Sequence, residues 1–128
     1  MIERYSRKEI KNIWEDYNRY SIWLKIELAA AEAMEKLKII PKGVVKKVRS
    51  KAIINPKRIL QIENKVKHDI IAFLTSITER AGKEARYLHK GMTSSDVLDT
   101  CFNLQLKQSG KILLKDINQL LQSIKKQA

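Results

Sequence analysis

The chain contains 128 residues, of which 44% are hydrophobic and 31% are charged, and its formal net charge is +12. This length suits one domain or a piece of a larger protein, and the composition excludes an intrinsically disordered chain. The single cysteine excludes an intrachain disulfide, and no apolar stretch approaches the ~20 residues that a membrane-spanning helix requires. We therefore expect a cytoplasmic protein that has no membrane partner.

Apolar residues recur at helical spacing in the first third of the chain, and no stretch alternates as a β-strand would. Ser6 and Glu9 have the spacing of a capping box, which predicts a first helix over residues 7–15. A second helix is expected over residues 18–37, and Pro41 is expected to end it. The apolar face of this second helix is predicted to comprise Ile22, Trp23, Leu24, Ile26, Leu28, Ala29, Ala33 and Leu37.

The middle of the chain is predicted to form three helices. Residues 42–52 have the pattern of a short basic helix. Asn55 and Pro56 predict the start of the next helix, because Asn is a favourable cap and Pro fits the first helical position. The third helix begins with the apolar run IIAFL, and Gly82 is expected to stop it, since glycine tolerates the backbone conformation that commonly ends a helix.

From Ser94 onward the apolar residues keep helical spacing to the last residues. Such a helix would be ~50 Å long, which is longer than a domain of this size needs. We expect it to enter a helical bundle whose other helices are absent from these 128 residues. The apolar stripe is predicted to comprise Val97, Cys101, Leu104, Leu113, Ile117, Leu120 and Ile124, with Cys101 in the core. The predicted fold class is all-α.

The stretch HKGMTSSDVLDT has the features of a helix start. Gly91 permits the chain to turn, Thr93 can cap the helix, and Asp96 places a carboxylate near the positive end of the helix dipole. A cap needs one hydroxyl, so Ser94 and Ser95 are left over. Hydroxyls beside the free N–H groups of a helix N-terminus form a natural site for a carboxylate or a phosphate, and we expect an anion to bind here.

The two histidines of the chain, His68 and His89, both lie where helices are expected to break. Histidine can transfer a proton near neutral pH, so their positions suggest a polar pocket. The alternative is that each is a helix-end residue bonded to the backbone. Two histidines without further His or Cys ligands at suitable spacing do not indicate a metal site. A serine hydrolase is also disfavoured, because no strand and no Gly-x-Ser-x-Gly turn precede the serines.

Three stretches, MIERYS, KHDIIAF and HKGMTSSDVLDT, together resemble the N-terminal portion of the bacterial adenylosuccinate lyases, a family of the fumarase/aspartase superfamily. The resemblance covers the whole chain and marks it as a fragment. It implies an N-terminal helical domain over residues 1–92 and the start of a long central-bundle helix over residues 93–128. It also implies a reaction without metal or organic cofactor: elimination of fumarate from adenylosuccinate, and from the succinyl-carboxamide ribotide of purine biosynthesis.

The same resemblance implies roles for individual residues, with His68 at the reacting centre. The substrate-binding residues that it implies are Arg4, Tyr5, Lys67, His68, Asp69, Thr93 and Ser94, with His89 and Ser95 as further candidates. Family members combine residues from three subunits of a homotetramer, and they carry a second catalytic histidine and a serine-bearing loop further along the chain. We therefore expect a small nucleotide as the substrate, and we expect these 128 residues by themselves to be inactive.

Three other interpretations are compatible with part of the pattern. The chain could belong to another lyase of the fumarase/aspartase superfamily, or it could be an interaction protein that pairs through its last helix. The charge of +12 also allows a basic helical nucleic-acid-binding module. However, the densest basic stretch, KGVVKKVRSK, has no aromatic residue that could stack on a base, and we expect no nucleic-acid partner.

Overall fold

The structure, a computed structural model, describes residues 2–127, and for Glu3 it describes the backbone only. All regular elements within these residues are helical, so the all-α prediction is confirmed. In chain order they are η1 (Glu3–Tyr5), α1 (Lys8–Trp14), α2 (Asp16–Lys36), α3 (Val44–Lys51), α4 (Pro56–Val66), α5 (Asp69–Ala81), η2 (Gly82–Tyr87) and α6 (Ser94–Gln127), where η denotes a 3₁₀ helix. No helix among them is both long and apolar enough to cross a membrane.

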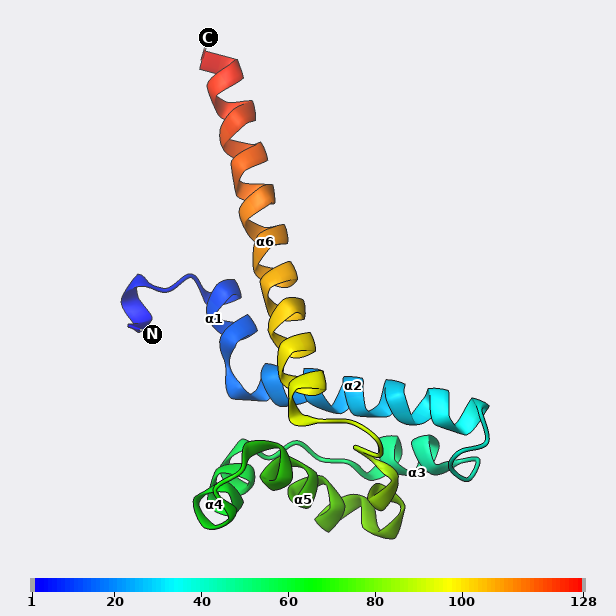
Figure 1. Cartoon of the computed structure of the whole chain (residues 1–128). Helices are drawn as coiled ribbons and strands as arrows, with labels where there is room; N and C mark the ends of the chain where they lie inside the picture. The colour runs from blue at the N-terminus through cyan, green and yellow to red at the C-terminus, as the bar shows by residue number, and fades with distance from the viewer. Residues whose placement is uncertain (1, 128) are drawn as a thin grey trace.

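The helices are arranged as a packed body and one projecting helix (Figure 1). α2 lies across the layer that α3, α4 and α5 form, and α6 rises from α2 and points away from that layer. α1 lies beside the lower part of α6, and the N-terminal segment stands out next to it. We call α2 to η2, together with the start of α6, the packed body, and we call residues 113–127 of α6 the projecting stretch.

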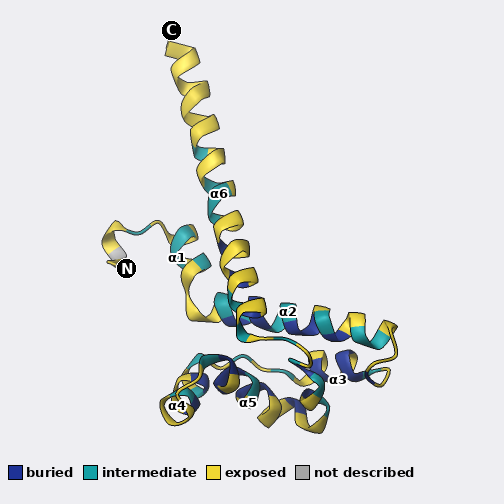
Figure 2. Cartoon of the chain, in the orientation of Figure 1, coloured by how far each residue is buried: buried dark blue, intermediate teal, exposed yellow. Residues whose placement is uncertain are grey.

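Burial changes along α6 (Figure 2). Val97, Cys101 and Gln105 are buried where α6 contacts α1 and α2. The Nε2 group of Gln105 donates to the carbonyl of Ile13 in α1 at 2.7 Å. Burial raises the pKa of the Cys101 thiol, and the prediction that Cys101 is a core residue is confirmed. From Leu113 onward the apolar side chains of the helix are exposed.

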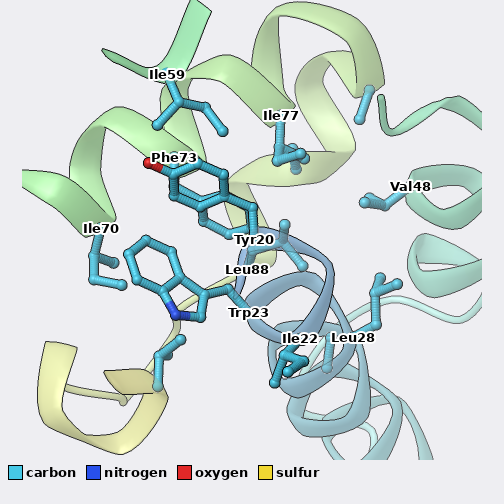
Figure 3. Packing of buried hydrophobic residues seen from close by; sticks show 14 of the residues in the cluster. Tyr20, Ile22, Trp23, Leu28, Val48, Ile59, Ile70, Phe73, Ile77 and Leu88 are labelled. Atoms are coloured by element: carbon cyan, nitrogen blue, oxygen red, sulfur yellow. The ribbon is translucent and has the colours of Figure 1, made fainter. Parts of the chain in front are cut away.

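Three aromatic side chains from α2 and α5 form the centre of the packed body (Figure 3). The Trp23 ring lies edge-on to Phe73 with centroids 5.4 Å apart, and Tyr20 stacks on Phe73 at 6.1 Å. All three are buried, as are Ile59 of α4 and Val48 of α3. Aromatic pairs in such geometries contribute ~0.5–1.5 kcal/mol beyond the area that they bury. The core therefore joins α3, α4 and α5 to one face of α2.

The face of α2 that packs in the body is rotated from the predicted one. Its buried residues are Tyr20, Ile22, Trp23, Glu27, Leu28 and Ala31. The prediction was therefore wrong at Ala29, Ala33 and Leu37, which are exposed. The reason is Glu27. A carboxylate is normally expected on the solvent side of a helix. If Glu27 is assigned to the solvent side, the predicted apolar face shifts toward Ala29 and Ala33.

The end of α2 at Lys36 agrees with the predicted range to within one residue, but Pro41 is not what ends the helix. The N–H of Ile39 donates to the carbonyl of Met34 at 2.9 Å, and Lys38 between them has a left-handed φ of 59°. This arrangement is a Schellman motif, which satisfies the last carbonyls of a helix without a proline.

One predicted helix cap was wrong and another is confirmed. The capping box at Ser6 does not form: Arg7 precedes α1 and gives it no side-chain hydrogen bond, while the Ser6 hydroxyl donates to the carbonyl of Ile2 at 2.7 Å. The extended residue between Ser6 and the helix moves the hydroxyl out of register with the free N–H groups. Asn55 caps α4 as predicted, by accepting from the N–H of Arg58 at 3.1 Å.

Candidate functional site

The first group of candidate residues, Lys67, His68 and Asp69, lies at the junction between α4 and α5. Lys67 ends α4 with a left-handed φ of 55°. His68 caps α5, because its Nδ1 accepts a hydrogen bond from the N–H of Ile71 at 3.4 Å. Asp69 opens α5, and its Oδ1 accepts from the N–H of Ile70 at 2.7 Å. Two of the three side chains are thus oriented by the helix start that they occupy.

The imidazole of His68 is bonded to the backbone, as one of the two interpretations predicted, and it also keeps an open nitrogen. Because Nδ1 accepts from Ile71, the proton of the neutral ring lies on Nε2. Nε2 has no hydrogen-bond partner within residues 2–127, and the His68 side chain is 47% exposed. Asp69 Oδ1 lies 3.5 Å from Nδ1, so a carboxylate stands beside the ring. His68 can therefore present a proton on its open side.

The second group of candidate residues lies at the start of α6. The N–H of Thr93 donates to Oδ2 of Asp96 at 2.8 Å, and the N–H of Asp96 donates to the Thr93 carbonyl at 3.1 Å. The Asp96 carboxylate therefore forms its half of a capping box, near the positive end of the helix dipole. Among the described residues, the hydroxyls of Thr93, Ser94 and Ser95 have no hydrogen-bond partner. These three hydroxyls are available to a ligand.

His89 is held by a residue that the sequence did not single out. Glu27 of α2 is fully buried, its Oε2 accepts from the backbone N–H of His89, and its Oε1 lies against Nδ1 of the same residue, both at 2.7 Å. Neither interpretation of His89 anticipated a buried carboxylate as its partner. The signal in the sequence was the helical spacing of Glu27 from Trp23 and Ala31, which places it on the apolar face. A charged residue on such a face is almost never fully buried unless it is paired, so a partner could have been expected.

Both junctions contain strained backbone. The described non-glycine residues with positive φ are Lys38 at 59°, Lys67 at 55° and His89 at 60°. Such conformations cost ~1–3 kcal/mol each and persist where surrounding contacts hold them. The N–H of Lys67 donates to the carbonyl of Glu63 at 2.7 Å, and Glu27 holds His89. At Lys67, as at Lys38, the left-handed residue ends a helix, whereas His89 is held in this conformation by a buried side chain of another helix, which favours a functional role for His89.

The third group, Arg4 and Tyr5, lies apart from the other two. Both residues belong to η1, in the N-terminal segment beside α1, whereas the first group lies in the α4–α5 layer on the other side of α2 (Figure 1). The guanidinium of Arg4 lies 4.8 Å from the centroid of the Tyr5 ring, a cation–π contact, and both side chains are exposed. One copy of the chain therefore does not bring all candidate substrate-binding residues together.

Several basic side chains of the packed body are paired with carboxylates. Arg58 of α4 donates two hydrogen bonds to Glu79 of α5, at 2.6 and 3.0 Å, and this contact lowers the pKa of Glu79. Lys47 of the basic helix α3 lies 3.2 Å from Glu84, and its hydrogen bond lowers the pKa of that carboxyl. Both pairs join neighbouring elements of the packed body. Residues 2–127 contain no group of three His, Cys, Asp or Glu that could hold a metal ion.

Sequence comparisons identify relatives along the entire chain. A profile of the protein family described as lyase matches residues 3–128. The adenylosuccinate lyases of Bacillus subtilis and of a Synechocystis species are each 45% identical to this chain over 128 residues. Each match covers 100% of this chain and 30% of the relative, so the chain spans about 30% of the length of these relatives.

A structural comparison agrees with the all-helical architecture. The crystal structure of a fumarate lyase from Mesorhizobium sp. BNC1 matches with a TM-score of 0.80, over 88% of this chain and 27% of that chain. The sequence identity in this match is 22%, so it shows the fold alone. The family resemblance that the sequence motifs predicted is confirmed by the sequence relatives.

Proposed function

The chain belongs to the lyase family, and we propose that it forms the N-terminal part of an adenylosuccinate lyase. Such an enzyme eliminates fumarate from adenylosuccinate to give AMP, and acts likewise on the succinyl-carboxamide ribotide of purine biosynthesis. The observation that carries the proposal is the 45% identity to two adenylosuccinate lyases over the entire chain. Because the chain spans 30% of those relatives, the activity is proposed for a longer polypeptide that contains it.

The proposed reaction breaks the bond between a carbon of the succinyl group and the nitrogen of the purine precursor. A base removes a proton from the carbon beside a carboxylate, the electron pair forms the double bond of fumarate, and an acid protonates the departing nitrogen. His68 is the candidate at the reacting centre, because its open Nε2 bears the proton of the neutral ring. It can donate that proton, or a hydrogen bond, to the substrate. Side chains suffice for these steps, since only protons pass between the protein and the substrate.

The start of α6 is the proposed holder of a substrate carboxylate. An anion there meets the positive end of the helix dipole and the available hydroxyls of Thr93 and Ser94. The Asp96 carboxylate accepts the Thr93 N–H, so the donors that remain for the substrate are the hydroxyls and the N–H groups of Ser94 and Ser95. The remaining substrate contacts are proposed for Arg4, Tyr5, Lys67 and Asp69, with His89 and Ser95 as secondary residues.

The proposal extends to architecture and location. Residues 1–92 would form an N-terminal helical domain, and residues 93–128 would begin a helix of the central bundle of a homotetramer. The exposed apolar side chains of the projecting stretch support a bundle, because such a stripe is expected to be covered. Arg4 and Tyr5 would reach His68 of a neighbouring subunit. The free, buried Cys101 is compatible with a reducing cytoplasm.

The test is turnover by a polypeptide that contains these residues and continues into the catalytic segments of its relatives, purified free of host lyase. The absorbance change that accompanies conversion of adenylosuccinate to AMP is followed, with argininosuccinate as a comparison substrate. We expect adenylosuccinate to be consumed and fumarate to be released in equal amounts. Conversion of argininosuccinate only, or of neither substrate, would contradict the proposal.

A further inference from the structure

Among the described buried residues, Glu27 is the only charged one, and the reaction proposed above does not use it. Burying a carboxylate is costly unless hydrogen bonds compensate the lost hydration. Both oxygens of Glu27 contact a single residue, His89, which lies 62 positions further along the chain. A buried carboxylate whose two oxygens both contact one residue beside a candidate site suggests a role beyond packing.

The first oxygen of Glu27 fixes the backbone ahead of α6. Oε2 accepts the N–H of His89, which begins a turn that the Met92 N–H closes by donating to the His89 carbonyl at 3.3 Å. Thr93 follows this turn directly. Because His89 has a left-handed φ of 60°, its backbone needs a contact that holds it. Glu27 therefore anchors the segment from which the hydroxyls at the start of α6 extend.

The second oxygen of Glu27 assigns the proton of the imidazole. A carboxylate offers acceptors only, so Nδ1 of His89 carries the proton in the 2.7 Å contact with Oε1. Nε2 has no hydrogen-bond partner in the described part of the chain and is not among its buried unpartnered atoms, so it is open to solvent. The proton placement is the opposite of that in His68, whose Nδ1 accepts.

We infer that Glu27 is a positioning residue of the anion-binding site at the start of α6. It holds the turn that leads to Thr93 and Ser94, and its carboxylate accepts from Nδ1 of His89. In the doubly protonated ring, Nε2–H is then the donor that remains for a carboxylate or phosphate group. The identity of this anion as a part of the lyase substrate rests on the proposed function. The proton placement in His89 does not.

Glu27→Gln separates the two tasks of the side chain with almost no change of shape. The amide oxygen can still accept from the His89 N–H, but the amide nitrogen then faces Nδ1 and can only donate, so the neutral ring must carry its proton on Nε2. Nitrogen-15 NMR of the histidine-labelled chain, at a pH where the ring is neutral, distinguishes the two tautomers. The chain has two histidines, so a His68→Asn variant assigns the signals.

We expect the proton of His89 on Nδ1 in the native chain and on Nε2 in Glu27→Gln. Glu32→Gln is the matched control, because Glu32 is an exposed glutamate of the same helix, and it should leave the His89 signals unchanged. A bare Nδ1 in the native chain, or an unchanged tautomer in Glu27→Gln, would overturn the inference regardless of whether the longer polypeptide is a lyase.

The consequence for binding is measured in the longer polypeptide. Glu27→Gln should raise KM roughly tenfold with little change in kcat, because the amide nitrogen cannot accept from Nδ1 and the doubly protonated ring that donates to the anion loses its partner. In a His89→Asn background, where an amide can face either partner, Glu27→Gln should have no further effect on KM. An unchanged KM in the single variant, or additive effects in the double variant, would overturn the positioning role. If the native polypeptide does not convert adenylosuccinate, the proposed function fails, and the NMR result still decides the role of Glu27 toward His89.

Discussion

Two stretches of α6 carry the same pattern of apolar residues and have different surroundings. In residues 97–105, Val97 and Cys101 are 0% and 2% exposed against α1 and α2. In the projecting stretch, Ile117 and Leu120 are 60% and 61% exposed. The spacing predicts a helix and its apolar face, but only a neighbouring surface decides whether that face is covered. The packed body thus anchors the histidines, whereas the projecting stretch presents a surface that no described helix covers.

The largest expected effect is the absence of activity when the projecting stretch has no partner. A polypeptide of these 128 residues should not convert adenylosuccinate, because Arg4 and Tyr5 lie apart from His68 in one copy. A missing acid–base partner alone costs ~10²–10⁴-fold in rate. The absorbance assay measures this, with the longer polypeptide as positive control. Turnover by the 128-residue polypeptide would contradict this prediction, since it would show that activity does not require a partner for the projecting stretch.

The next effect sharpens the role of the packed body. In the longer polypeptide, His68→Ala should lower kcat by ~10²–10⁴-fold, because it removes the proposed proton carrier. It also removes the cap of α5, so His68→Asn is the matched variant: Asn can accept from the Ile71 N–H while lacking Nε2. We expect both variants to be equally impaired, and His68→Asn to keep the native melting temperature. Native turnover in His68→Asn would mean that the residue is only a cap.

A third measurement compares the two regions by stability. Phe73→Ala should lower the free energy of unfolding of the 128-residue chain by ~3–5 kcal/mol, because the ring is completely buried against Trp23 and Tyr20. Leu120→Ala should change it by no more than about 0.5 kcal/mol, because that side chain is already exposed. Denaturant unfolding of dilute samples gives both values. A large loss in Leu120→Ala would show that the projecting stretch is covered in solution.

A fourth measurement concerns local opening of α6. Backbone amides beyond Lys107 should exchange rapidly with solvent in a monomeric sample, while those of residues 97–105 should be protected. The buried residues of α6 all lie in the latter stretch, and the contacts of Gln108 and Ser109 with α1 and α2 are exposed polar ones. Hydrogen-exchange mass spectrometry over a dilution series measures this difference. Protection that increases with concentration would indicate self-association through the apolar stripe. Slow exchange in a strictly monomeric sample would contradict the comparison.

The smallest effect is a pH dependence within the packed body. The hydrogen bonds from Arg58 lower the pKa of Glu79 in the folded state, so the pair stabilises the fold above the ordinary carboxyl pKa and loses this contribution as pH falls through the lowered value. Glu79→Gln should therefore be slightly less stable than the native chain at neutral pH and equal to it in acid. Denaturant unfolding at both pH values tests this. In an Arg58→Gln background, the difference should vanish at every pH.

Much of the fold could be predicted from the sequence, because it depends on contacts within a few residues. The helical class, the cap at Asn55 and the stop at Gly82 all follow from local backbone chemistry, and the structure confirms them. The end of α2 was predicted to within one residue, but the motif that ends it was missed, because a lysine occupies the left-handed position where a glycine is the usual signal. The residue types around His68 and Thr93 marked the two helix junctions of the candidate site.

Long-range partners were decided only by the tertiary structure. The sequence contains Glu27 and His89 but does not indicate that α2 turns the carboxylate inward to meet a residue 62 positions away. Likewise, it predicts one stripe along α6 and cannot distinguish the part that α1 and α2 cover from the part that they leave open. Helix formation is governed by neighbours along the chain. Burial of a charge or of an apolar face is governed by the surfaces that meet in space, and these exist only once the helices have packed.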